Sequence, residues 1–161
     1  MEQAFKLEQG LTKAERYERF LELFKPFIEG ETDRLAALAN TAAALHEAFG
    51  FFWVGFYLVA NDEWLSLGPF QGSVACSRIR KGRGVCGTAW QIGETQIVPD
   101  VDAFPGHIAC SSQSRSEIVV PIRDSQGRVT AVLDIDSDKP ADFDTTDQKG
   151  LEAVAECLKK V

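Results

Sequence analysis

Three cysteines and one acidic residue stand out, because together they could carry out sulfur redox chemistry. Cys110 ends the segment Gly106-His107-Ile108-Ala109-Cys110, and Glu117 follows it. Cys76 and Cys86 lie upstream. A thiolate is a nucleophile, and an oxidised cysteine can condense with a second thiol to form a disulfide. A nearby carboxyl group could supply the proton that such chemistry needs.

Basic residues lie between the two upstream cysteines, namely Arg78, Arg80, Lys81 and Arg83, and Arg115 follows Cys110. A nearby cation favours the thiolate over the thiol, so this pattern predicts cysteines of lowered pKa. His107 could act as a base for Cys110, but their separation in the sequence does not decide whether they touch. Cys157 differs, since it lies beside Val154 in a predicted helix and is expected to be a small buried apolar residue.

The spacing of the four cysteines does not favour a metal site. None of them forms the short C-x2-C pair that is common in zinc sites, and His46 and His107 are the two histidines of the chain. We therefore expect no metal ligands. Gly82, Gly84 and Gly87 suggest a mobile or phosphate-binding loop, but they do not match either nucleotide-binding motif.

Length and charge narrow the class of protein. A chain of 161 residues fits one domain with a single core. The 24 acidic and 17 basic residues give a net charge of -7, which argues against nucleic-acid binding. The sequence contains neither an apolar run long enough to span a membrane nor a signal peptide, so we expect a cytoplasmic protein with reduced cysteines.

Hydrophobic periodicity predicts helices from about Thr12 to Ile28 and from Leu35 to Phe49, the second ending at Gly50. A third helix is expected around Leu151 to Leu158, with Asp144 as a possible N-cap. Strands are predicted at Phe51–Val59, Trp64–Leu67, Thr95–Val98, Glu117–Arg123 and Arg128–Asp136. The result is an α+β fold: a central antiparallel sheet with the N- and C-terminal helices on one face, and the segment from Pro69 to Arg115 on the other.

Alternation along the first strand separates its two faces. Phe52, Val54, Phe56 and Leu58 form an apolar row suited to packing beneath the helices. Trp53 and Tyr57 lie on the opposite face, where they could wall a small-molecule pocket or could simply belong to the core.

The last two strands bring acidic residues to that same face. The apolar residues of the first of these strands have even numbers, and those of the second have odd numbers. For both sets to face the same core, each even-numbered residue must pair with an odd-numbered one. A two-residue loop at Ser125-Gln126 would place Glu117 opposite Asp134, with Asp136 as a third acid on the same face. Single acids at strand ends are often solvated, but three beside Trp53 and Tyr57 favour a site with at least one raised carboxyl pKa.

The chain resembles the free methionine-(R)-sulfoxide reductases, small proteins of the GAF fold. The resemblance covers nearly the whole chain, and its most specific stretches are Trp53-Val54-Gly55-Phe56-Tyr57, Leu67-Gly68-Pro69-Phe70-Gln71-Gly72, Ala75-Cys76, Gly82-Arg83-Gly84-Val85-Cys86-Gly87-Thr88-Ala89, Gly106-His107-Ile108-Ala109-Cys110, Ser116-Glu117-Ile118-Val119 and Leu133-Asp134-Ile135-Asp136-Ser137. It implies a single GAF domain over residues 1–161, with an N-terminal extension and first helix at 1–28 and the core with its catalytic loops at 31–161.

The resemblance also implies roles for the candidate residues. Cys110 matches the catalytic cysteine, which attacks the sulfoxide sulfur and becomes a sulfenic acid. Cys76 matches the cysteine that resolves this acid as a disulfide, and Cys86 matches a third cysteine that is an alternative disulfide partner or relay. Trp53 and Tyr57 match aromatic residues of the pocket. The substrate-site acids are Glu117 and Asp136, which we assign to the sulfoxide oxygen, and Asp134, which we assign to the ammonium group, although the division could be reversed.

Free methionine-(R)-sulfoxide is the implied substrate, thioredoxin or a similar dithiol the implied reductant, and no bound cofactor is expected. Ser111 and Arg115 depart from the family pattern, which bears on substrate affinity and on the pKa of Cys110. A homodimer is suggested by the resemblance and by the apolar opening helix, with a monomer as the alternative. The competing functions are a GAF-type ligand or redox sensor without turnover, and a scaffolding domain.

Overall fold

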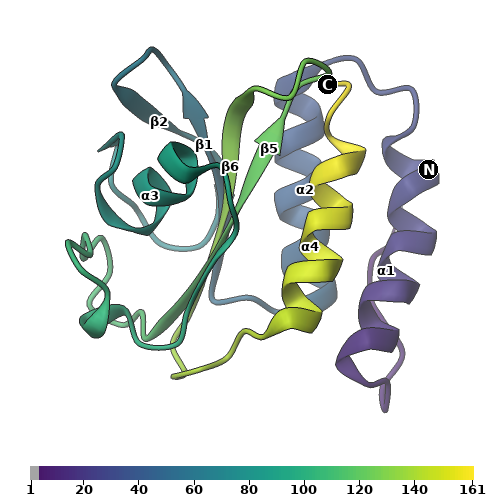
Figure 1. Cartoon of the computed structure of the whole chain (residues 1–161). Coiled ribbons are helices and arrows are strands. Elements are labelled where there is room, and N and C mark those ends of the chain that lie inside the picture. Colours follow the sequence, from purple (N-terminus) through teal and green to yellow (C-terminus); the bar gives the residue numbers. More distant parts are fainter. Residues whose placement is uncertain (1–3) are drawn as a thin grey trace.

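The computed structural model describes residues 4–161, so the first three residues of the expected N-terminal extension lie outside the described part. Within these residues, four α-helices, six strands and one 3-10 turn follow one another (Figure 1). The order is α1 (Lys13–Ile28), α2 (Arg34–Phe49), β1 (Trp53–Val59), β2 (Trp64–Gln71), β3 (Arg78–Arg80), α3 (Gly84–Ile92), β4 (Gln96–Val98), η1 (Val101–Ala103), β5 (Ser116–Arg123), β6 (Val129–Ser137) and α4 (Thr145–Cys157).

The six strands form one antiparallel sheet in the order β3-β2-β1-β6-β5-β4. The central strands β1, β6 and β5 divide the molecule into two sides. In Figure 1, α2 and α4 cover one face of the sheet, with α1 outside them, and α3 lies on the other face with the long loops. This arrangement confirms the predicted α+β fold.

The main core lies between the sheet and the terminal helices. Val54 and Phe56 of β1 join Ile118 and Val120 of β5 there, and all are almost fully buried. Phe20 and Phe24 of α1 are also fully buried, so this helix is part of the core rather than an appendage. Burial of apolar surface at about 25 cal/mol per Å² is the main force that holds these layers together.

Local signals fix the ends of the helices. Thr12 and Asp144 each form a capping box, at the start of α1 and of α4, which confirms the predicted N-cap at Asp144. Gly50 ends α2 in the left-handed conformation, with φ of 66°, as its position predicted. The buried Asp147 of α4 accepts hydrogen bonds from Lys13 and Tyr17, and these bonds tie α1 to the C-terminal helix.

The segment between β2 and β4 contains two elements that the sequence did not predict, the short strand β3 and the helix α3. Its glycines suggested a loop, but two of them allow α3 to pack closely. A side chain at Gly87 would collide with the backbone carbonyl of Arg80, and one at Gly84 would press on Ile108. Cys86 therefore lies within a buried helix and not in a loop.

The predicted register of the last hairpin is wrong: β6 is shifted by two residues along β5 relative to the prediction. Glu117 lies opposite Asp136, and Asp134 lies opposite Val119. The turn is longer than two residues, because the Asp124 carboxylate accepts hydrogen bonds from the backbone N–H groups of Gln126 and Arg128. The parity argument itself holds, since β5 and β6 still turn their apolar rows toward the helices and their acids away.

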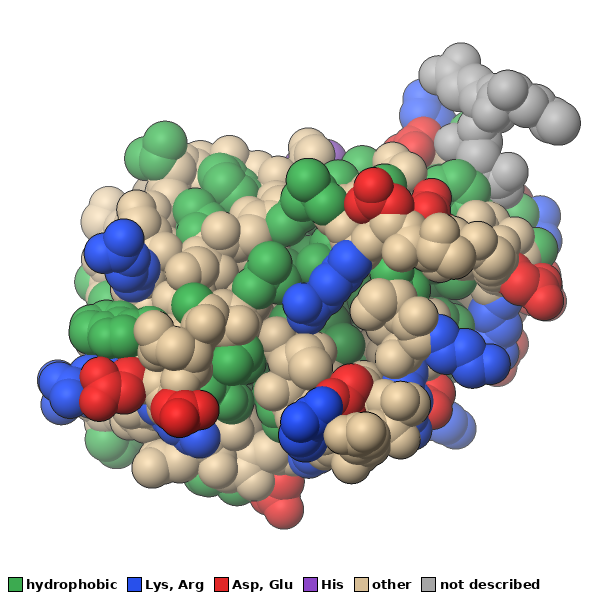
Figure 2. All heavy atoms as spheres, turned by 90° about the horizontal axis from the view of Figure 1, so that it is seen from above, with side chains coloured by type: hydrophobic (Ala, Val, Ile, Leu, Met, Phe, Trp, Pro, Cys, Tyr) green, Lys and Arg blue, Asp and Glu red, His purple; other side chains and the backbone are tan. Residues whose placement is uncertain are grey.

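No helix within residues 4–161 has the length and apolar character needed to cross a membrane. Figure 2 shows the molecule from above, with basic and acidic side chains interspersed among apolar ones. That face therefore presents charges of both signs.

Candidate active site

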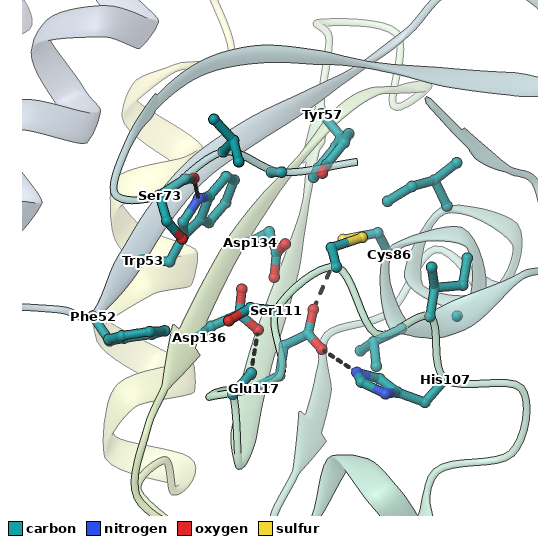
Figure 3. Close-up of a pocket in the computed structure, with 18 of the residues that line it drawn as sticks. Phe52, Trp53, Tyr57, Ser73, Cys86, His107, Ser111, Glu117, Asp134 and Asp136 are labelled. Carbon is teal, nitrogen blue, oxygen red and sulfur yellow. Dashed lines mark hydrogen bonds and ion pairs between the residues drawn. The ribbon is translucent and has the colours of Figure 1, made fainter. Parts of the chain in front are cut away.

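A pocket lies on the face of the sheet that the terminal helices leave uncovered. Strand residues such as Trp53, Glu117 and Asp134 line it together with Cys86 of α3 and His107 (Figure 3). Val74 and Ile108 are also among its lining residues. The sequence analysis proposed eight residues for the site, and seven of them line this pocket: Trp53, Tyr57, Cys86, Cys110, Glu117, Asp134 and Asp136. The eighth, Cys76, is bonded to Cys110, and its neighbour Ala75 lines the pocket.

The three acidic residues lie together on the pocket floor, from β5 and β6. Glu117 and Asp134 are each only 6% exposed, and Asp136 lies directly across the strand pair from Glu117. Burial, followed by the charges of neighbouring acids, holds the pKa of Glu117 and of Asp136 well above the usual carboxyl range. Like charges opposite one another are costly, so these two carboxyl groups favour the protonated form.

Asp134 differs from its two neighbours. Burial also raises its pKa, but interactions with Glu117, Cys86 and His107 oppose that rise. Asp134 is thus the acid of the cluster best able to remain ionised. Its Oδ1 atom is buried and has no hydrogen-bond partner within the described residues.

Glu117 connects the acids to a thiol and an imidazole. Its Oε1 atom lies 4.0 Å from the Cys86 sulfur, and its Oε2 atom lies 3.9 Å from His107 Nε2 (Figure 3). His107 thus contacts the acid cluster, a role that the sequence did not indicate. On the far side of the cluster, the Ser114 hydroxyl donates to Asp136 at 3.1 Å.

Cys76 and Cys110 are joined by a disulfide, and both are half-buried at the rim of the pocket. The Tyr57 hydroxyl donates a 2.9 Å hydrogen bond to the backbone carbonyl of Cys76. Cys86 and Cys157 remain free thiols. The structure therefore pairs the two cysteines that the family resemblance had paired.

Aromatic rings form the wall beside β1. Trp53 stacks between Tyr57 and Phe70, with ring centroids 6.2 Å and 5.3 Å away, and its indole N–H donates to the Ser73 carbonyl. Trp53 and Tyr57 are on the pocket face, as predicted. Phe52 was expected beneath the helices, but it precedes β1 and lines the pocket instead.

The expected effect of the basic residues is wrong for Cys86. Burial, followed by the charges of Asp134 and Glu117, raises the pKa of its thiol. The basic side chains lie elsewhere, since Arg80 stacks over Trp64 and Lys81 over Trp90. Arg83 alone of the four lines the pocket.

Sequence reasoning missed Phe52, Ser73, Arg83 and Ser114 as lining residues. Ser73 and Ser114 lie outside the strands, so no periodic signal marks the direction of their side chains. Arg83 was noted for its charge and as part of a family motif; it occupies the N-cap position of α3, a helix that the sequence did not predict.

Comparison with known proteins agrees with this geometry. Residues 33–158 match the GAF domain family. A free methionine-R-sulfoxide reductase from Escherichia coli is 45% identical over 152 residues, which cover 94% of this chain and 91% of the relative. The chain belongs to the free methionine-R-sulfoxide reductases of the GAF family.

Two further similarities support this membership. The GAF domain-containing protein A of Dictyostelium discoideum is 56% identical over 147 residues, covering 91% of this chain and 92% of that protein. The crystal structure of the Neisseria meningitidis free methionine-R-sulfoxide reductase in complex with its substrate is 54% identical and superposes with a TM-score of 0.91. It covers 96% of this chain, and the match spans 93% of the Neisseria chain, so the resemblance to a free methionine-R-sulfoxide reductase extends over the complete fold.

Proposed function

We propose that this protein reduces free L-methionine-(R)-sulfoxide to L-methionine through cysteine sulfenic acid and disulfide chemistry. The observation that carries the proposal is the Cys76–Cys110 disulfide at the rim of a pocket whose floor holds three acids. A nucleophile, a second thiol and proton donors thus meet at one cavity. Membership of the reductase family supports the same substrate.

In the first step the thiolate of Cys110 attacks the sulfur of the sulfoxide. The oxygen passes to the cysteine, giving Cys110 sulfenic acid and methionine, so the sulfoxide sulfur is reduced as the cysteine sulfur is oxidised. The S–O bond weakens more readily when its oxygen is protonated or hydrogen-bonded. Glu117 and Asp136, the two acids that favour the protonated form, are the proton donors.

In the second step the thiol of Cys76 attacks the sulfenic acid of Cys110. The S–S bond forms, and the sulfenic oxygen leaves as water. A dithiol carrier of the thioredoxin type then reduces this disulfide by exchange and becomes oxidised itself. Cys86 takes no part in this pairing, because its thiol is buried beside Glu117.

The pocket offers a partner for each end of an amino acid. Asp134, the acid of the cluster best able to remain ionised, is the partner of the substrate ammonium, since its buried Oδ1 has no other hydrogen-bond partner among the described residues. Arg83 gives α3 no side-chain cap, so the first N–H groups of this helix are open to the substrate carboxylate. Trp53 and Tyr57 supply the apolar wall for the side chain.

Three further features of the proposal rest on the sequence alone. They are the division of the domain into an N-terminal extension with the first helix (1–28) and a core with the catalytic loops (31–161), the assembly into a homodimer, and a cytoplasmic location. A ligand sensor is the alternative function, and turnover separates it from a reductase, because a sensor binds without releasing product.

The test is incubation of the protein with dithiothreitol and each epimer of free methionine sulfoxide, followed by measurement of methionine. We expect catalytic turnover of the R epimer and none of the S epimer. Binding of the R epimer without release of methionine would favour the sensor.

A further inference from the structure

One group of side chains in the pocket has the composition of a metal site. The Cys86 sulfur and one carboxylate oxygen each of Glu117 and Asp134 lie within 4.8 Å of one another, and all three residues are buried. They come from α3 and from the paired strands β5 and β6, which lie more than twenty residues further along the chain. The spacing of cysteines along the chain could therefore give no sign of this group.

An independent observation indicates that the group lacks a ligand. Asp134 is 94% buried, since its exposed fraction is 6%, and its Oδ1 atom has no hydrogen-bond partner among the described residues. Figure 3 shows this carboxyl group pointing into the pocket between Cys86 and Glu117. A buried oxygen without a partner loses free energy of hydration that nothing in the protein restores, so a cation placed there would be stabilised.

The donor atoms select the kind of cation. Magnesium and calcium prefer sites made of oxygen alone, whereas zinc accepts a thiolate together with carboxylates and imidazole. We infer that Cys86, Glu117 and Asp134 form a binding site for Zn²⁺ in the substrate-free pocket. His107 Nε2 lies 3.9 Å from Glu117 Oε2 but is not one of the three mutually close donors, so it could serve as a fourth ligand only after it moves toward the other two.

Small movements convert the observed arrangement into zinc geometry. Ligand atoms on a tetrahedral zinc ion are about 3.3–3.7 Å apart, given Zn–O and Zn–S bonds of about 2.0–2.3 Å. The Cys86 sulfur and Glu117 Oε1 are 4.0 Å apart, so this pair needs to close by only a fraction of an ångström. All three donor atoms lie within 4.8 Å of one another, so tetrahedral coordination requires the widest pair to close by about 1 Å.

Binding has two chemical consequences. The Cys86 thiol releases its proton as the Zn–S bond forms, and no electron is transferred. The ion also takes the Asp134 and Glu117 oxygens that the proposed function assigns to the substrate. Competition with the sulfoxide thus rests on that proposed function, whereas metal binding itself does not.

The disulfide state of the protein provides a clean test. With Cys76 and Cys110 locked together, the two free thiols are Cys86 and Cys157. The measurement uses oxidised, EDTA-treated and desalted Cys157→Ser protein, titrated with Co²⁺ as a spectroscopic substitute for Zn²⁺. We expect one Co²⁺ per chain, a thiolate-to-cobalt charge-transfer band and loss of both when one equivalent of Zn²⁺ is added.

Variants identify the ligands. Cys86→Ser should abolish the charge-transfer band, and Asp134→Asn should weaken Zn²⁺ binding at least tenfold, while Glu63→Gln, an exposed acid remote from the pocket, should change neither. Thermal unfolding of each metal-free variant establishes that it is folded. A band that survives Cys86→Ser, or cobalt that binds without a band, would overturn the inference.

Turnover assays separate the two proposals. Zn²⁺ should inhibit the reductase competitively with the R sulfoxide, and EDTA should restore the rate. A protein that binds cobalt as expected but never releases methionine refutes the proposed function and leaves the metal site standing. An active enzyme that binds no cobalt refutes the metal site alone.

Discussion

The Tyr57 hydroxyl donates a 2.9 Å hydrogen bond to the backbone carbonyl of Cys76, and so links the aromatic wall of the pocket to one half of the disulfide. Tyr57 is 2% exposed and stacks on Trp53, which leaves its ring little freedom. The bond therefore holds the Cys76 segment in place over the pocket, where the sulfur can reach Cys110.

Replacement of Tyr57 by phenylalanine should slow disulfide formation more than the first chemical step. The variant keeps the ring but loses a bond worth about 0.5–1.5 kcal/mol, which corresponds to a fall of roughly twofold to tenfold in rate. Single-turnover experiments can follow methionine release and thiol loss separately. An equal effect on both phases would contradict a role confined to the Cys76 segment.

Replacement of Glu117 by glutamine should lower activity and raise stability together. The amide keeps the shape but cannot give a proton to the sulfoxide oxygen, so we expect a loss of about a hundredfold or more in turnover. It also removes a buried acid opposite Asp136, which should stabilise the metal-free fold by up to about 1 kcal/mol, the upper end of the usual cost of like charges across a strand pair.

Denaturant unfolding in EDTA and steady-state kinetics check the two parts of this prediction. Glu63→Gln is the matched control, because it makes the same chemical change at an exposed position. If Glu117→Gln were both less stable and fully active, the carboxyl group would be a structural element and not a proton donor.

Replacement of Cys86 by alanine should leave the Cys76–Cys110 disulfide able to form. The Cys86 thiol is buried in α3 beside Glu117, and burial near acids keeps it protonated and unreactive. Titration of thiols after one round of sulfoxide reduction should therefore show two thiols lost in both proteins. Accumulation of sulfenic acid in the variant would instead assign Cys86 a part in resolution.

Replacement of Gly87 by alanine should destabilise the domain by about 1–3 kcal/mol, the usual cost of overpacking. The new methyl group would press on the Arg80 carbonyl and lie 3.2 Å from the Gly82 nitrogen. Because α3 carries Cys86 and one wall of the pocket, substrate affinity should fall as well. Unfolding curves and KM test these effects, and an unchanged stability would mean that α3 can shift without cost.

Most of the fold could be predicted from alternation and capping, and the reasons for the failures are local. Alternate residues of a strand share one face of the sheet, and the apolar rows must face the helices. This alternation alone placed Trp53, Tyr57 and the three acids together on the opposite face. The register was wrong because the Asp124 side chain bonds two backbone N–H groups and lengthens the turn. Such side-chain bonds leave no periodic trace in a sequence.

The helix α3 escaped prediction because glycine has a low intrinsic helix propensity. Gly84 and Gly87 are needed there for close packing on Ile108 and on the Arg80 carbonyl, contacts that only the tertiary structure reveals. The same omission hid the burial of Cys86 and its contact with Glu117. The cysteine pairing came from family resemblance, since Cys76 and Cys110 are brought together by loops that carry no periodic pattern.

The central claim, that Cys110 reduces the free R sulfoxide and Cys76 resolves it, is tested most directly by methionine yield in a single turnover. Reduced Cys76→Ser and Cys110→Ser proteins are freed of reductant and mixed with excess free methionine-(R)-sulfoxide. The account predicts one methionine per chain from Cys76→Ser, with a trapped sulfenic acid, and none from Cys110→Ser. Equal yields from the two variants, or methionine formed by Cys110→Ser, would contradict it.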